Sequence, residues 1–297
     1  MGGYRAVTAT ARDRQSERGA ALVVVLWGVA LIAAAVVAIG MVSRSESLIA
    51  RNALEDARAR EAAEAGIQLA LHRLLSYPRG AHPFDGTPTT WRDGTVSVAL
   101  EIQDEEGKID LNVAPFALIE GALRNAGASD PAARRIACAI VARRGYPDPQ
   151  CLSDDAPPPA VQPGLIVAVE ETRHFAGIGD ALYRRLAPLV TVFSGSAAID
   201  PRIAPADVLL AVPTLSRGFV ESYIDRRAAW HDEGAMPQNL GELNDPRFFA
   251  VSTGRTFAIS ARAATASGGH HTAEMVVRLT YRSDRPYAVL AWREPTG

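Results

Sequence analysis

Residues 20–43 form an uninterrupted stretch without a charged side chain, AALVVVLWGVALIAAAVVAIGMVS. As a helix this stretch is about 36 Å long, at about 1.5 Å per residue, which is enough to cross a bilayer core of about 30 Å. Because a backbone in hydrocarbon must satisfy its own hydrogen bonds, the stretch must be helical there. Residues 1–19 carry more arginines than acids. The positive-inside rule therefore predicts a single pass with a cytoplasmic N-terminus and the main domain outside the cytoplasm.

A cleaved signal peptide is the ordinary alternative for such a stretch. The stretch is longer than a typical signal-peptide core, and no A-x-A cleavage motif follows it. Residues 44–75 contain no proline and only one glycine, Gly66, and are rich in strong helix formers. Helical spacing of apolar residues follows at Ile67, Ala70, Leu71 and Leu74. We expect one retained helix of about 55 residues that ends before Pro78 and packs on an exported domain.

The residues around the start of the apolar stretch resemble a processing site of pilins. Residues 18–22, RGAAL, are similar to a prepilin peptidase site, with cleavage after Gly19 and Ala20 as the new, N-methylated first residue. Most pilins carry Glu at the fifth mature position, where this chain has Val24. The following residues 51–67 resemble the minor pseudopilin K of the type II secretion system (general secretion pathway protein K), whose members characteristically lack that Glu.

Further segments resemble the same family over nearly the full length of the chain. Residues 104–112, DEEGKIDLN, are similar to its DExGKIDLN segment. Residues 175–188 resemble its second signature, and Ala291-Trp292-Arg293 its usual ending. The resemblance implies an inner-membrane protein with a periplasmic domain that initiates the pseudopilus at its tip and takes part in protein secretion across the outer membrane. Its implied partners are other minor pseudopilins through the helix and sheet, the prepilin peptidase, and a secreted substrate or the secretin at the tip.

Val24 has a physical meaning within this resemblance. In the family's packing, a fifth-position Glu neutralises the N-terminal amine of the subunit ahead. A carboxylate in lipid is tolerated only when it is paired. A tip subunit has no neighbour ahead, so its Glu would be unpaired, and Val24 removes that cost. The alternative is that Val24 is an ordinary lipid-facing residue of a membrane anchor.

The sequence of the exported part predicts an α+β fold. In this fold the pilin-like long N-terminal helix packs on a small antiparallel sheet, and the sheet carries a large α-helical insertion. Alternation predicts strands at residues 95–102, 256–262, 273–281 and 287–292. The predicted organisation is a leader (1–19), a transmembrane half-helix (20–43), a periplasmic half-helix (44–77), a sheet (78–107 and 249–297) and a helical insertion (108–248).

The insertion contains an internal repeat. Residues 109–115, IDLNVAP, are echoed by residues 199–205, IDPRIAP. Each copy precedes two predicted helices, which are residues 116–126 and 131–144 in the first copy and 206–212 and 217–230 in the second.

This pattern, with Gly177-Ile178-Gly179, raises an alternative function: a helix-hairpin-helix DNA-binding or DNA-uptake membrane protein. Residues 170–227 carry seven arginines and seven acids, whereas phosphate binding needs a basic face. We therefore expect no nucleic-acid partner.

No catalytic motif is present, so we expect no enzyme. The adjacent His270 and His271 predict an exposed hairpin tip rather than a metal site. Asp154 and Asp155 in a Pro-rich loop, and residues 104–106, are hard oxygen ligands suited to Ca²⁺, although solvated loop acids are the commoner explanation. The resemblance implies Ca²⁺ in the insertion, but residues 143–148 depart from the family's Trp- and Asp-rich pattern. No other cofactor is expected.

Two cysteines, Cys138 and Cys151, are the only ones in the chain. In an exported domain they could form a disulfide, and the alternative is two free thiols.

Overall fold

The computed structural model describes residues 13–77, 84–145, 148–151, 163–233, 241–280 and 282–295. It divides into two compact units, Met1–Ala57 and Arg58–Gly297, which we treat separately. Helix α1 (Asp13–Ser76) has residues in both units.

In the first unit, α1 is a regular helix through the whole uncharged stretch. Every large apolar side chain from Leu22 to Met41 is exposed. Among the described residues, α1 is the one helix long and apolar enough to cross a membrane. Exposed apolar side chains on all sides of a helix are what a lipid-facing segment requires. The predicted helix is confirmed, and its properties fit a single-pass anchor.

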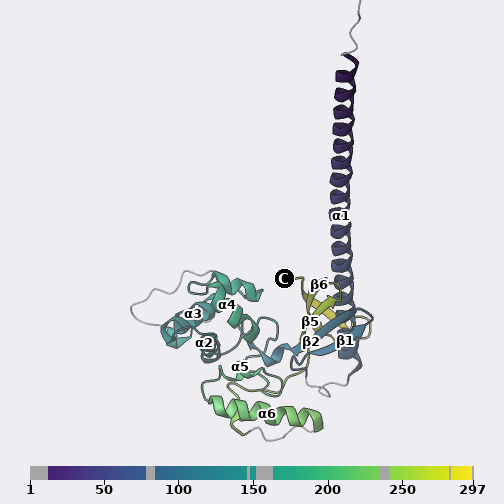
Figure 1. Ribbon diagram of the computed structural model, residues 1–297. Coiled ribbons are helices and arrows are strands. Elements are labelled where there is room, and N and C mark those ends of the chain that lie inside the picture. The colour runs from purple at the N-terminus through teal and green to yellow at the C-terminus, as the bar shows by residue number, and fades with distance from the viewer. Residues whose placement is uncertain are drawn as a thin grey trace, which may run out of the picture. The chain divides into compact units, whose positions relative to one another are not determined.

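The second unit contains a five-stranded antiparallel sheet in the order β1-β2-β5-β6-β7, which Figure 1 shows beside the C-terminal end of α1. The strands are β1 (Thr89–Asp93), β2 (Val96–Asp104), β5 (Thr256–Thr265), β6 (His270–Leu279) and β7 (Tyr287–Arg293). The end of α1 packs on one face of this sheet with a stripe of buried side chains: Ala59, Ala63, Ile67, Ala70, Leu71 and Leu74.

Gly66 explains how closely α1 approaches the sheet. A Cβ at this position would lie 2.9 Å from Val98 Cγ1 and 3.1 Å from Ala261 Cβ. The only glycine in the second half of the helix is therefore the residue that lets α1 lie against β2 and β5.

The insertion lies between β2 and β5 in the sequence. Its helices are α2 (Phe116–Asn125), α3 (Asp130–Arg143), α4 (Asp180–Leu186), α5 (Ala206–Leu209) and α6 (Arg217–Glu233). Short 3₁₀ turns are η1 (Glu105–Gly107), η2 (Pro149–Cys151), η3 (Val169–His174), η4 (Ala187–Leu189) and η5 (Gly241–Asn244). Two short strands, β3 (Ile109–Asp110) and β4 (Val190–Thr191), pair in parallel. The insertion has its own hydrophobic core, formed by residues from Ile109 to Phe249.

The structure confirms the predicted α+β fold of a long helix, an antiparallel sheet and further helices. Strand β1 was not predicted, because all five of its residues are exposed and show no alternation. Helix α5 is shorter than residues 206–212 suggested, since its C-cap is already Leu210.

Candidate functional site

The predicted processing residues lie at the start of α1. Gly19 and Ala20 are helical in this unprocessed chain. Val24 lies about 6 Å further along the helix axis, at about 1.5 Å per residue, and its side chain is 70% exposed. The structure thus presents an uncharged side chain at this position of the anchor. Processing after Gly19 stays a prediction.

The acidic run at the end of β2 forms the most unusual polar site of the second unit. The sequence suggested solvated loop acids here, and that expectation is wrong: Asp104, Glu105 and Glu106 are only 4%, 3% and 7% exposed. Burying a carboxylate is costly unless its oxygens are hydrogen-bonded or paired. Each of these side chains must therefore be held by partners, which come from the insertion and from the segment that leads back into β5.

Glu105 and Glu106 point to different segments. Glu105 Oε1 pairs with Lys108 Nζ at 2.7 Å, and its Oε2 accepts a hydrogen bond from Thr191 Oγ1 on β4. Glu106 accepts hydrogen bonds from Thr253, one from the backbone N–H at 2.9 Å and one from Oγ1 at 2.6 Å. Lys108 is the only lysine in the chain.

Asp104 completes the site. Its Oδ1 accepts the Glu106 N–H at 3.0 Å and its Oδ2 accepts the Ser252 hydroxyl at 2.7 Å. The backbone N–H of Ser252 donates to Asp200 Oδ2 at 2.7 Å. Residues 104–106 lead from the sheet into the insertion, and residues 252–253 lead back into β5. The carboxylates therefore join the two chain crossings between sheet and insertion, and we call this set the carboxylate junction.

Burial controls the electrostatics of the junction. It raises the pKa of Asp104 from 3.8 to about 7, against the opposing hydrogen bonds from Ser252 and the Glu106 backbone. The negative charges of Glu106 and Asp200 raise that pKa further. Burial also raises the pKa of Asp110, although hydrogen bonds from Gly195, Asn112 and Ser194 oppose the shift.

The two copies of the internal repeat share a structural feature: in each copy an aspartate accepts hydrogen bonds from two backbone N–H groups. Asp110 Oδ1 accepts the N–H of Asn112 at 2.8 Å and its Oδ2 accepts the N–H of Gly195 at 2.8 Å. In the second copy, Asp200 Oδ1 accepts the N–H of Arg202 at 2.9 Å and its Oδ2 accepts the N–H of Ser252. Both aspartates thus connect their own turn to a later segment of the chain.

An arginine binds the equivalent alanine carbonyl in each copy, and it is partly buried in the first copy and buried in the second. Arg144 Nη1 donates to the carbonyl of Ala114 at 2.8 Å, and Arg227 Nη1 donates to that of Ala204 at 2.6 Å. Burial lowers the pKa of both guanidinium groups. The sequence showed the repeated Ile-Asp and Ala-Pro pairs but not these arginines, because their distances from the aspartates differ between the copies.

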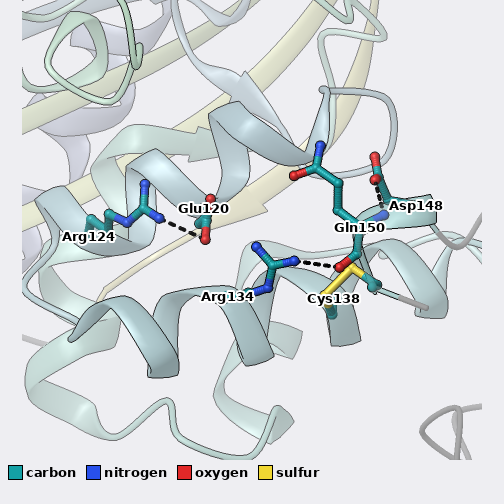
Figure 2. The surroundings of a disulfide bond; sticks show 7 residues. Glu120, Arg124, Arg134, Cys138, Asp148 and Gln150 are labelled. Atoms are coloured by element: carbon teal, nitrogen blue, oxygen red, sulfur yellow. Dashed lines mark hydrogen bonds and ion pairs between the residues drawn. A yellow bond between two sulfur atoms is a disulfide. The ribbon is translucent and has the colours of Figure 1, made fainter. Parts of the chain in front are cut away.

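The structure joins Cys138 and Cys151 in a disulfide. Figure 2 shows it beside Arg134, whose Nη2 donates to the carbonyl of Gln150 at 2.6 Å. The bond ties η2 to α3 at the start of the Pro-rich loop. Asp154 and Asp155, the candidate Ca²⁺ ligands, lie outside the described residues. Among the residues that are described, no group of three or more His, Cys, Asp or Glu side chains could hold a metal ion.

His270 and His271 are not at the hairpin tip. They are the first residues of β6 and pair with Ala264 and Ala263. The turn residues precede them, so only His270 is exposed, and His271 Nε2 lies 3.8 Å from Glu294 Oε2. The tip assignment was therefore wrong by one or two residues.

The Gly177-Ile178-Gly179 segment packs inside the insertion. Gly177 has a φ of 101°, and a Cβ there would lie 3.3 Å from Ile136 Cδ1 on α3. Ile178 is buried in the same core, and Gly179 is the N-cap of α4. The contact with Ile136 gives Gly177 a packing role, whereas a Cβ at Gly179 would meet nothing within 4 Å.

No protein-family model matches this chain, and no curated protein matches it either. The fold is similar to that of a chain in the crystal structure of the GspK-GspI-GspJ complex from the type 2 secretion system of enterotoxigenic Escherichia coli. The two share 14% sequence identity, the match covers 86% of this chain and 99% of that chain, and the TM-score is 0.48.

Proposed function

We propose that this protein is a minor pseudopilin at the tip of a type II secretion pseudopilus, where it initiates assembly and so takes part in protein secretion across the outer membrane. One observation carries the proposal. A single helix, α1, exposes an uncharged apolar segment at one end and supplies the core of an antiparallel sheet at the other. A chain built in this way is held in a membrane and carries its folded domain outside it.

The acidic motif of residues 104–112 supports the same proposal. Its acids are structural here: they hold the crossing from the sheet into the insertion, and Asp110 organises the first repeat. A motif whose side chains have such specific partners is a stronger basis for a family resemblance than a solvated acidic loop. The protein acts by assembly rather than by catalysis in this proposal.

The partners would be other minor pseudopilins, bound through α1 and the sheet, in the inner membrane and periplasm. Apolar side chains continue to be exposed beyond the uncharged stretch, at Leu48, Ile49 and Leu54. Exposed apolar positions on a helix are suited to helix–helix association. A pull-down of the full chain from membranes, followed by identification of co-purified pilin-like subunits, tests this part.

Processing is tested by mass spectrometry of the membrane-extracted protein. Prepilin peptidase cleavage predicts a mature N-terminus at Ala20 with one added methyl group. An N-terminus before Gly19, or one after the apolar stretch, would refute the pilin assignment.

The tip position is tested with a pair of substitutions, Val24→Glu and Val25→Glu. Both place one carboxylate in lipid, so both carry the same insertion cost. At the tip, neither carboxylate finds a partner amine, and both variants should assemble poorly to the same extent. If Val24→Glu assembles like the wild type while Val25→Glu does not, the residue at position 24 has a subunit ahead of it, and the tip position is wrong.

The alternative DNA-binding function has one observation in its favour, the helix-turn-helix repeat. Titration of the full chain with duplex DNA at increasing salt tests it. Binding that weakens steeply with salt would support DNA contact. The equal numbers of arginines and acids in residues 170–227 lead us to expect no such binding.

A further inference from the structure

A cavity of about 370 Å³ lies between the sheet and the insertion. Its floor is the face of the sheet opposite to α1, since Glu101 and Gln103 alternate with Leu100 and Ile102, which pack on the helix side. Its walls come from η3, α4, η4 and the segment that follows. This volume falls in the range of small-ligand pockets, roughly 300–1,000 Å³.

A polar row crosses the floor of this cavity. Strand pairing places Glu101 opposite Ser260, Ser260 opposite Glu274, and Glu274 opposite Arg293. Directly opposite residues on one face lie close enough to interact. The four side chains therefore form one line across β2, β5, β6 and β7, and all four line the cavity.

The two ends of this row are neutralised by ion pairs. Glu101 Oε1 pairs with Arg262 Nη1 at 2.7 Å. Arg293 Nη2 reaches across to Glu170 Oε2 on η3 at 3.1 Å. These pairs leave the middle of the row as the place where charge is not balanced.

The middle of the row consists of Ser260 and Glu274. Ser260 Oγ is buried and has no hydrogen-bond partner within the described part of the chain. Glu274 has neither an ion pair nor a side-chain hydrogen bond there, and its charge is among those that raise the pKa of the nearby Tyr183 hydroxyl, a shift caused mainly by burial. One unpaired carboxylate and one unpaired hydroxyl, side by side in a cavity, form an acceptor pair for a cationic donor.

Part of the wall is apolar, from Val169, Ala187, Pro188, Val190 and Phe193, and Glu170 and Tyr183 line the wall as well. The cations that line the cavity, Lys108, Arg262 and Arg293, each pair with a carboxylate of Glu105, Glu101 or Glu170, so one carboxylate remains, that of Glu274. A site with one such carboxylate beside apolar side chains matches a long side chain with a methylene stem and a cationic head. A metal ion would need more ligands than this floor offers, and no suitable group occurs in the described residues.

We propose that this cavity binds an arginine or lysine side chain of a partner polypeptide, with Glu274 and Ser260 receiving its cationic head. The charge complementarity of Glu274 and the apolar part of the wall select a basic side chain rather than an acidic or purely apolar one. Glu105 and Lys108 of the carboxylate junction also line this cavity, but they pair with each other.

The test is calorimetric titration of the full chain in non-ionic detergent with the capped tripeptide glycyl-arginyl-glycine amide. The citrulline analogue, which has the same shape without the charge, is the matched ligand. We expect the arginyl peptide to bind at least about tenfold more tightly, as for one charge-assisted hydrogen bond. Equal binding of the two peptides, or no binding of either, would overturn the proposal.

Variants and a second readout locate the ligand. Glu274→Gln should weaken binding about tenfold and Ser260→Ala severalfold, whereas Glu221→Gln, which changes an exposed acid on α6, should leave binding unchanged.

Lys108 lines the same cavity and is the only lysine in the chain. Its acylation, followed by peptide mass spectrometry, should therefore slow when the peptide is bound. The site would be refuted if the peptide did not change the acylation rate of Lys108, or if the folded Ser260→Ala and Glu274→Gln variants bound the peptide as the wild type does. Agmatine carries a guanidinium group but has no peptide bond. If it binds more tightly than the arginyl peptide, the occupant is not a polypeptide.

Discussion

Asp104→Asn is the substitution that probes the carboxylate junction most directly. The folded chain raises the pKa of this carboxyl from 3.8 to about 7 because the side chain is buried. The folded state therefore binds the proton more tightly than the unfolded chain does. The stability that protonation provides is fully present below about pH 3.8 and is lost as the pH rises through about 7.

The magnitude follows from the two pKa values. At about 1.36 kcal/mol per pKa unit, the difference between 3.8 and about 7 corresponds to roughly 4 kcal/mol of unfolding free energy. Asparagine keeps an oxygen that can accept the Glu106 N–H, but it carries no charge at any pH. The unfolding free energy of Asp104→Asn relative to the wild type should therefore increase by roughly 4 kcal/mol between about pH 4 and about pH 8.

The assay is urea unfolding of the full chain in non-ionic detergent at a series of pH values, followed by near-ultraviolet circular dichroism. Asp225→Asn, which removes one exposed acid on α6, is the control for the change in net charge. Parallel pH profiles for the wild type and Asp104→Asn would refute the reasoning. That result would mean that the junction holds the Asp104 carboxylate ionised without cost.

Further outcomes follow from the packing of two glycines and from the disulfide. Gly121→Ala should destabilise the insertion by about 2–4 kcal/mol, because the new Cβ would overlap the backbone carbonyl of Ala211. Gly218→Ala on α6 is its control, since a Cβ there meets nothing within 4 Å, and it should stabilise the helix by up to about 1 kcal/mol. Cys138→Ser and Cys151→Ser should each cost about 3 kcal/mol by opening a short loop, and a reducing agent should lower the wild-type melting temperature but not that of the variants.

Most regular elements of this fold could be predicted because their side chains follow a period. The stripe from Ile67 to Leu74 has helical spacing, and β5 alternates between the α1 side and the cavity side. Elements without such a pattern could not be found. Strand β1 is exposed throughout, and β3 and β4 have two residues each. Their positions are set by tertiary pairing and not by local sequence.

The candidate site was less predictable than the fold. Residues 104–106 look like a solvated acidic loop, and only the contacts with Thr191, Ser252 and Thr253 show that they are buried. These hydroxyl partners lie far from the acids in sequence and form no motif of their own. The sequence gives no sign of the unpaired Glu274 either, since a lone acid on an alternating strand is usually solvated.

The internal repeat shows why the aspartates of these contacts could be recognised in the sequence whereas their distant partners could not. Asp110 and Asp200 each use one oxygen on the turn that starts a helix and the other on a backbone N–H, of Gly195 or of Ser252. The side chain at this position needs two acceptor oxygens, which the aspartate carboxylate supplies. Its distant partner contributes a main-chain N–H, which any residue except proline provides. A contact of this kind therefore specifies the residue type at the aspartate and leaves the residue type at its distant partner open.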